Sequence, residues 1–186
     1  MEPHLSRILI GPEELQSAVA RLGRQITSDY RERDLVLIGI LKGSVFFLSD
    51  LARAVSLPLE IGFIGLSSYG AATETSGAVR ITHDLDTSIE GRDALIVEDI
   101  VDSGLTLDYL LRLLSARRPR SLGVCALLDK PARRRADVPL AYVGFTVEDA
   151  FVVGYGLDLD QKYRNLPYIG IINDEVRTMN DEQRQR

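Results

Sequence analysis

The chain has 186 residues, of which 45% are hydrophobic and 26% are charged, and its formal net charge is -5 at pH 7. We expect one globular domain over residues 1–186, because this length and composition exclude disordered, collagen-like and solenoid proteins. The acidic balance argues against a nucleic-acid partner bound by bulk electrostatics, since phosphate-driven binding needs a basic face.

Hydropathy and cysteine content limit the location and the chemistry. The longest apolar run extends from Leu35 to Leu41, far short of the ~18 residues of a membrane span. The first ten residues have neither a basic start nor a long apolar core, so we expect a cytoplasmic protein without a membrane partner. With Cys125 as the single cysteine and two histidines, an internal disulfide and a Cys/His zinc cage are excluded.

The first half of the chain alternates between helical and extended patterns. A helix is predicted between Gly11 and Arg33, where apolar residues recur with helical spacing, and Leu35–Leu41 reads as a strand buried on both faces. Ser44 can cap the next helix, which stops before Pro58. The segments that follow are a strand at Leu59–Leu66, a mobile Gly/Ala/Ser/Thr-rich loop at Ser67–Gly77, and strands at Ala78–His83 and Asp93–Asp99.

The second half continues this alternation. Ile100–Gly104 is expected to turn into a helix that stops near Pro119. The remaining segments are a strand at Ser121–Leu128, an Arg-rich loop at Asp129–Pro139, short strands at Ala141–Phe145, Phe151–Tyr155 and Tyr168–Ile172, and a polar tail at Asn173–Arg186. The pattern predicts an α/β domain with a mainly parallel sheet, whose ligands bind beyond the carboxyl ends of the strands.

The segment from Leu95 to Thr106 places an apolar strand, two carboxylates, a short loop and a helix start in succession. Backbone N–H groups and hydroxyls at such a helix start form a concave set of donors that suits a phosphate monoester. The donors expected here belong to Ser103, Gly104, Leu105 and Thr106.

Three carboxylates flank this predicted phosphate site. Glu98 and Asp99 would repel phosphate, so they fit a partner that is neutral or positively charged. The hydroxyls of a ribose 5-phosphate diol and a Mg²⁺ ion are such partners. Asp102 is a candidate general base. The alternative is an ordinary helix cap at Asp102–Ser103 beside two solvated carboxylates, but the whole combination favours a ligand site.

The pattern of strand, acidic pair, loop and helix resembles the phosphoribosyl diphosphate signature of the type I phosphoribosyltransferases. The resemblance implies a twisted, mainly parallel sheet flanked by helices, with a small hood and a mobile catalytic loop. It also places Ile100 and Val101 in the nucleotide-binding loop with the flanking residues from Glu98 to Thr106. P-loop and dinucleotide glycine motifs are missing from the sequence, which disfavours those two classes.

Segments between residues 8 and 172 resemble one branch of that family, the hypoxanthine-guanine phosphoribosyltransferases, and most closely the shorter bacterial enzymes. The resemblance implies that Lys42, Gly43 and Arg164 bind pyrophosphate, with a peptide bond after Leu41 that is often cis in the family. It further implies that Ser68 and Tyr69 open the catalytic lid, which keeps water from the reactive sugar.

The same resemblance assigns the purine and metal sites. Lys130 would contact the purine O6, Phe151 would stack on the base, and backbone at Val152 and Asp158 would read the purine edge. Asp158 would hold Mg²⁺ as well, together with the Glu98 and Asp99 carboxylates.

The resemblance implies purine salvage. The expected substrates are phosphoribosyl diphosphate and hypoxanthine or guanine, which give IMP or GMP and pyrophosphate, with Asp102 holding a proton at purine N7. It also implies a homodimer or homotetramer. Two alternatives stay open: transfer to xanthine or adenine, and a regulator that senses phosphoribosyl diphosphate and binds nucleic acid. The features that favour the regulator are Arg117, Arg118, Arg120, Arg133, Arg134 and Arg135, although a charge run is usually a solvated face.

Overall fold

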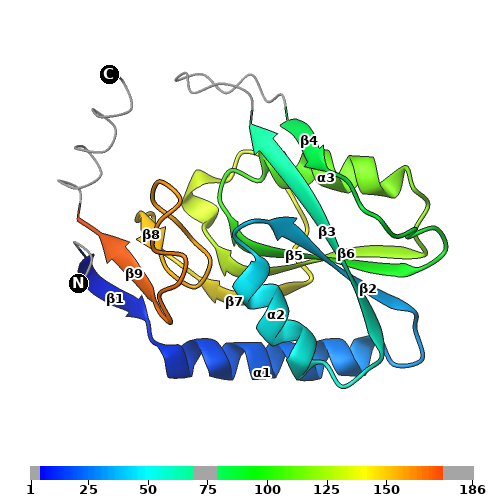
Figure 1. Cartoon of the computed structure of the whole chain (residues 1–186), viewed down its shortest axis with the longest axis horizontal. Helices are drawn as coiled ribbons and strands as arrows, with labels where there is room; N and C mark the ends of the chain where they lie inside the picture. Colours follow the sequence, from blue (N-terminus) through cyan, green and yellow to red (C-terminus); the bar gives the residue numbers. More distant parts are fainter. Residues whose placement is uncertain (1–4, 69–78, 174–186) are drawn as a thin grey trace.

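The computed structural model describes residues 5–68 and 79–173, which form two sheets and three α-helices in those ranges (Figure 1). The strands are β1 Leu5–Ile10, β2 Leu35–Leu41, β3 Leu59–Ser68, β4 Val79–His83, β5 Asp93–Val101, β6 Ser121–Asp129, β7 Tyr142–Thr146, β8 Val152–Val153 and β9 Ile169–Ile172. The helices are α1 Pro12–Asp29, α2 Val45–Ala54, α3 Leu105–Ser115 and a short 3-10 helix at Pro131–Arg133.

The larger sheet has the strand order β4-β3-β2-β5-β6-β7. The pairs β3–β2, β2–β5, β5–β6 and β6–β7 are parallel, and β4 adds an antiparallel edge. Parallel pairing brings the carboxyl ends of β2, β5 and β6 to the same edge of the sheet. This edge is where the sequence analysis expects the ligands to bind.

Helices cover both faces of this sheet, with α1 and α2 on one face and α3 on the other (Figure 1). Residues of β2 alternate between the two cores: Leu35 and Leu37 pack with α1 and α2, whereas Val36 and Ile38 pack with α3. Strand β2 is therefore buried on both faces, as its unbroken apolar run predicts.

The smaller sheet joins the two ends of the described chain in the antiparallel order β1-β9-β8 and corresponds to the expected hood. Figure 1 shows it beside the carboxyl edge of the larger sheet. The sequence patterns did not predict β1, because most of its residues are partly or fully exposed and show no clean alternation. Pairing with β9, far away in the sequence, is what makes this segment a strand.

Several element boundaries differ from the predictions. Strand β5 continues past the predicted end at Asp99 to Val101, because pairing with β6 extends as far as Asp129. Strand β3 likewise continues to Ser68 through pairing with β4. The predicted strand at Phe151–Tyr155 shortens to Val152–Val153, because Gly154 and the next two residues adopt positive φ and turn the chain.

Ser44 occupies the N-cap position of α2, as predicted, but its hydroxyl does not cap the helix. It donates instead to the backbone oxygen of Ile40 at 2.7 Å, which anchors the helix start to the end of β2. The first two residues of the predicted mobile loop at Ser67–Gly77 belong to β3, and the rest of that loop lies outside the described residues. The predicted polar tail also lies outside them from position 174 onward. None of the described helices is both long and apolar enough to cross a membrane.

Candidate active site

Three loops meet at the carboxyl edge of the larger sheet. They follow β2 at Lys42–Gly43, β5 at Asp102, and β6 at Lys130. The Leu41–Lys42 peptide bond is cis, as the resemblance implies. A cavity of about 540 Å³ opens between this edge and the hood. Its lining includes Asp99, Ile100, Asp102, Lys130, Phe151, Val152 and Asp158, so the fold brings these seven predicted site residues together.

A second cavity of about 150 Å³ lies at the start of α3. It is lined by Glu98, Ile100, Val101, Asp102, Ser103, Gly104, Thr106 and Leu107. Gly104 has a φ of 79°, a backbone conformation that favours glycine, and it turns the loop into the first residue of the helix, Leu105. The predicted phosphate loop thus surrounds a cavity at a helix N-terminus, where backbone donors and the helix dipole favour an anion.

Asp102 lines both cavities and stands at their junction. Its Oδ1 atom is buried and has no hydrogen-bond partner in the described part of the chain. A buried carboxylate oxygen without a partner is rare in folded proteins, because leaving it unpaired costs free energy. A ligand that donates a proton or a hydrogen bond at this junction would satisfy it.

The loop between β6 and β7 donates hydrogen bonds to the backbone of the predicted phosphate loop, a contact that the sequence analysis did not predict. The Arg134 guanidinium donates to the backbone oxygens of Asp102 at 3.1 Å and Val101 at 3.4 Å, and pairs with the Asp129 carboxylate. The backbone N–H groups of residues 135 and 136 donate to the oxygen of Ser103 at 2.8 and 3.1 Å. These contacts restrain the backbone beside the Asp102 side chain.

Glu98 and Asp99 differ in their surroundings although they are adjacent. Glu98 lines the phosphate cavity, and its Oε2 atom is buried without a hydrogen-bond partner in the described ranges. Asp99 lines the larger cavity and lies directly against Gly43, where an added Cβ would come within 1.8 Å of Asp99 Oδ2. Burial raises the pKa of Glu98 well above its ordinary value and that of Asp99 to about 6.

The predicted metal ligands do not form one cluster. Over residues 5–68 and 79–173, no three Asp, Glu, His or Cys side chains are close enough together to hold a metal ion. Asp99 and Asp158 both line the larger cavity, and the Asp158 charge contributes to the raised pKa of Asp99. Two carboxylates at one cavity match the donor set of Mg²⁺ sites that complete their coordination with substrate oxygens.

The predicted pyrophosphate-binding cations meet at Gln161, a residue that the sequence analysis did not single out. The Oε1 atom of Gln161 accepts from Lys42 Nζ and from Arg164, each at 3.3 Å. Arg164 also pairs with Asp158 at 2.7 Å, and Asp158 accepts from the Gln161 backbone at 2.8 Å. The Gln161 oxygen thus occupies the focus of two cations, where an anionic oxygen would be stabilised.

The hood side of the large cavity carries the predicted purine contacts. Lys130 is buried, with 5% of its surface exposed, and its ammonium donates to the Ala150 oxygen at 2.8 Å. Phe151 is partly buried, whereas Val152 is buried and its strand pairs with β9. The cavity therefore joins a buried cation, an aromatic ring and strand backbone, a set that suits a flat heterocycle with a carbonyl group.

Of the two predicted lid residues, the structure describes only Ser68. Ser68 is the last residue of β3, and Tyr69 lies outside the described residues.

The Arg-rich segments are mostly neutralised by nearby acids. Arg117 pairs with Asp84 and Arg118 with Glu90, each at 2.7 Å. The other ion pairs are Arg120 with Asp93, Arg133 with Asp149 and Arg134 with Asp129. Five of the six arginines that favoured a nucleic-acid-binding regulator therefore have a local acidic partner.

The fold and these two cavities define a class. The family model of the phosphoribosyl transferase domain matches residues 5–160, which include both sheets up to the loop after β8. Its match covers the loop at Lys42–Gly43, the loop after β5 and the cavity-lining residues up to Asp158, whereas Arg164 and the cavity residues on β9 lie beyond it. The chain thus carries a type I phosphoribosyltransferase fold.

Comparison with individual proteins narrows the class. The chain is 54% identical over 178 residues to a hypoxanthine-guanine phosphoribosyltransferase of Mycobacterium avium, covering 92% of this chain and 88% of the relative. It is 50% identical over 176 residues to the hypoxanthine-guanine phosphoribosyltransferase of Bacillus subtilis, covering 95% of this chain and 98% of the relative. A crystal structure of the Staphylococcus aureus hypoxanthine phosphoribosyltransferase superposes with a TM-score of 0.90 at 48% sequence identity, and the match covers 93% of this chain and 94% of that chain. The chain belongs to the hypoxanthine-guanine phosphoribosyltransferase family.

Proposed function

We propose that this enzyme transfers the 5-phosphoribosyl group of phosphoribosyl diphosphate to N9 of hypoxanthine or guanine, in the salvage of purines. The single observation that supports the proposal is a pair of cavities whose linings share Ile100 and Asp102. One cavity has the donors for a 5'-phosphate, and the other has the buried Lys130 and the aromatic Phe151 for a 6-oxopurine.

In the proposed reaction, the bond from the ribose C1 to pyrophosphate breaks ahead of the new bond to N9. Negative charge then develops on the leaving pyrophosphate, where Lys42 and Arg164 would stabilise it electrostatically. Lys130 would donate to O6, and Asp102 would accept the proton at N7, so that N9 becomes the better nucleophile. Both groups lie on the same cavity, as this division of roles requires.

The proposal includes Mg²⁺, which Asp99 and Asp158 would hold together with substrate oxygens. When bound, the ion would neutralise the diphosphate and so make it a better leaving group. Glu98, on the phosphate cavity, would face the ribose hydroxyls or the metal. The partnerless Glu98 Oε2 and the raised pKa values of Glu98 and Asp99 both fit carboxylates that await a donor or a cation.

The purified enzyme can be assayed with phosphoribosyl diphosphate, Mg²⁺ and each of hypoxanthine, guanine, xanthine and adenine, following nucleotide formation by absorbance. We expect product from hypoxanthine and guanine. Omission of Mg²⁺ with a chelator should abolish turnover. Product from xanthine or adenine alone would show that the base assignment is wrong, and binding of phosphoribosyl diphosphate without any product would favour the regulator.

The proposal extends to a cytoplasmic homodimer or homotetramer. Val45 and Phe46 on α2 support an oligomer, because these apolar side chains are 38% and 41% exposed beside the pyrophosphate loop. Light scattering coupled to gel filtration should give a mass of two or four chains, and a monomer at micromolar concentration would contradict this part of the proposal.

A further inference from the structure

A tight turn connects the purine-binding strand β8 to the segment that carries Asp158 and Arg164. It consists of Gly154, Tyr155 and Gly156, whose φ angles are 102°, 50° and 106°. A non-glycine residue rarely adopts positive φ, and here it does so between two glycines. The turn's backbone is held by donation from the Tyr155 N–H to the Leu166 oxygen at 2.9 Å.

This Gly154–Gly156 turn lies directly against the pyrophosphate loop. A Cβ added at Gly156 would come within 1.9 Å of the backbone oxygen of Gly43, so the two backbones are in contact. Gly156 is also bonded twice to Arg164: its oxygen accepts from the guanidinium at 2.6 Å, and its N–H donates to the Arg164 oxygen at 2.9 Å. The position of the turn therefore sets where Arg164 stands relative to Lys42 and Gly43.

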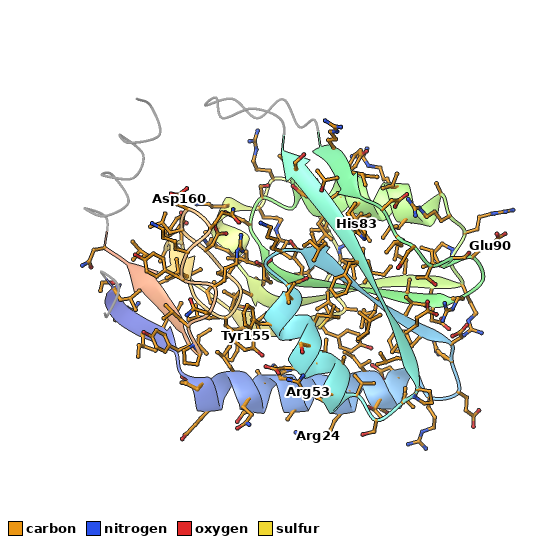
Figure 2. The ribbon with its side chains drawn as sticks, in the orientation of Figure 1. Arg24, Arg53, His83, Glu90, Tyr155 and Asp160 are labelled. Atoms are coloured by element: carbon orange, nitrogen blue, oxygen red, sulfur yellow. The ribbon has the colours of Figure 1, made fainter. Side chains whose placement is uncertain are left out.

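The Tyr155 side chain ties the turn to the other side of the pyrophosphate loop. Its ring is 9% exposed and packs in the core with residues of α1 and α2, and its hydroxyl donates to Oδ2 of Asp50. Asp50 lies on α2, the helix that begins just after the pyrophosphate loop, and it also pairs with Arg53. Figure 2 shows Tyr155 beside α2, which carries Arg53.

We infer that Tyr155 is a positioning residue for diphosphate binding: its hydrogen bond to Asp50 holds the Gly154–Gly156 turn, and through it Arg164, in register with the pyrophosphate loop. The inference rests on the proposed function, because it takes Lys42, Gly43 and Arg164 as the diphosphate site. With its ordinary pKa of 10.0 the Tyr155 hydroxyl is already protonated at neutral pH, and burial raises that pKa further, so the hydroxyl is a hydrogen-bond donor there.

Substituting Tyr155→Phe removes the hydroxyl and keeps the ring. A matched control is Tyr142→Phe, since the Tyr142 hydroxyl donates to Asp29 Oδ2 at 2.7 Å and thus also links a tyrosine to an aspartate. That pair joins β7 to the end of α1 and is remote from the turn. The two variants therefore lose the same kind of bond at different places.

The experiment measures, by calorimetry, the dissociation constants of phosphoribosyl diphosphate with Mg²⁺ and of GMP, which lacks the diphosphate. For Tyr155→Phe we expect the value for phosphoribosyl diphosphate to rise by about tenfold, the effect of one lost hydrogen bond. The value for GMP should stay unchanged, and Tyr142→Phe should change neither. Equal weakening of both ligands, or no weakening in the folded variant, would overturn the inference.

A second pair of variants covers the case in which Tyr155→Phe does not fold. Asp50→Asn keeps an oxygen acceptor for the Tyr155 hydroxyl, whereas Asp50→Ala removes it. We expect Asp50→Ala to weaken the binding of phosphoribosyl diphosphate but not of GMP, and Asp50→Asn to retain most of the affinity for phosphoribosyl diphosphate. The same loss of this affinity in both variants would overturn the inference. Turnover of the unmodified enzyme tests the proposed function separately, because the binding ratios do not depend on it.

Discussion

Asp102 lines both cavities of the candidate active site. It lies where the phosphate cavity meets the purine cavity, and its Oδ1 atom is buried without a hydrogen-bond partner among the described residues. Burying an acceptor in this way costs folding free energy, which a purely structural role would not require. Its position and its unused hydrogen-bond acceptor are those expected of a group that accepts a proton or a hydrogen bond from a substrate.

Replacing Asp102 by Asn should lower kcat by roughly 10²- to 10⁴-fold, the usual contribution of a general base. The amide keeps the size of the side chain but does not accept a proton. Affinity for phosphoribosyl diphosphate should change little, and steady-state kinetics with both substrates varied separates the two effects. Asp108→Asn on α3 is the control, because that carboxylate pairs with Arg112 at the surface. Normal turnover of Asp102→Asn would refute the base assignment.

At the scale of elements, the phosphate loop after β5 depends on the loop after β6. The Arg134 guanidinium reaches two backbone oxygens of the phosphate loop, at Val101 and Asp102, while its pairing with Asp129 holds it in place. A planar guanidinium offers five N–H donors in a fixed geometry, more than the three of a lysine ammonium or the two of a glutamine amide. The geometry of the anion site is therefore set partly from a neighbouring strand.

Substituting Arg134→Gln should weaken binding of ribose 5-phosphate by about tenfold or more, because the loss of two hydrogen bonds of about 1 kcal/mol each loosens the loop. Binding of guanine alone should be affected less. Arg135→Gln changes the next residue, whose side chain is exposed, and should leave both affinities intact. Calorimetric titration measures these affinities, and equal losses for phosphate and base would argue for a general structural defect.

A second group of contacts between elements lies at the opposite edge of the sheet. Arg92, just before β5, pairs with Asp34 at 2.7 Å and with Glu60 on β3 at 2.6 Å. Hydrogen bonds hold the pKa values of both carboxyls below their ordinary values of 3.8 and 4.5, with Arg92 the largest cause for Asp34 and Thr87 and then Arg92 for Glu60. Arg92 thereby joins the starts of three neighbouring strands.

This network makes stability dependent on pH. Because the two carboxyls are more acidic in the folded state, the unfolded chain binds more protons near their ordinary pKa values, and stability rises with pH there. The contribution is complete at neutral pH and is lost as pH falls through the lowered values. Urea unfolding of Arg92→Gln should therefore show a loss of stability at pH 7 that shrinks below the ordinary values of 3.8 and 4.5. A difference independent of pH would contradict this explanation.

At the scale of the whole molecule, the binding site spans two sheets that are held together by different parts of the chain. The larger sheet supplies the phosphate loop and Lys130, whereas the hood supplies Phe151, Val152 and Asp158. The hood depends on β1 pairing with β9, so both ends of the described chain contribute to the purine side of the cavity.

Hydrogen exchange should report this division. We expect ribose 5-phosphate to slow exchange at the start of α3, guanine to slow it in β8 and β9, and GMP to slow it in both regions. The reason is that only a ligand spanning both cavities restrains both sheets against local opening. Mass spectrometry of peptides from the two regions makes the comparison, and protection of the hood by ribose 5-phosphate alone would show that the sheets respond as one unit.

Features encoded in short stretches of sequence were predictable. The apolar run at Leu35–Leu41 predicted a strand buried on both faces, and the segment from Glu98 to Thr106 predicted the loop that now lines a small cavity and the helix after it. These signals are local, because burial on two faces and turning into a helix each depend on the residues within a few positions. The resemblance added the predicted purine residues, which the fold brings to one cavity, and the predicted pyrophosphate residues Lys42 and Arg164, which meet at Gln161.

Tertiary structure alone decided what depends on pairing between distant segments. Strand β1 exists through its pairing with β9, and β5 continues to Val101 because β6 continues beside it. The sequence near Gln161 did not predict its contact with two cations. The sequence near Arg134 likewise did not predict its hydrogen bonds to the phosphate loop. Sequence periodicity reports which face of an element is buried, whereas the partner across that face is set by strand order and register, which only the folded chain defines.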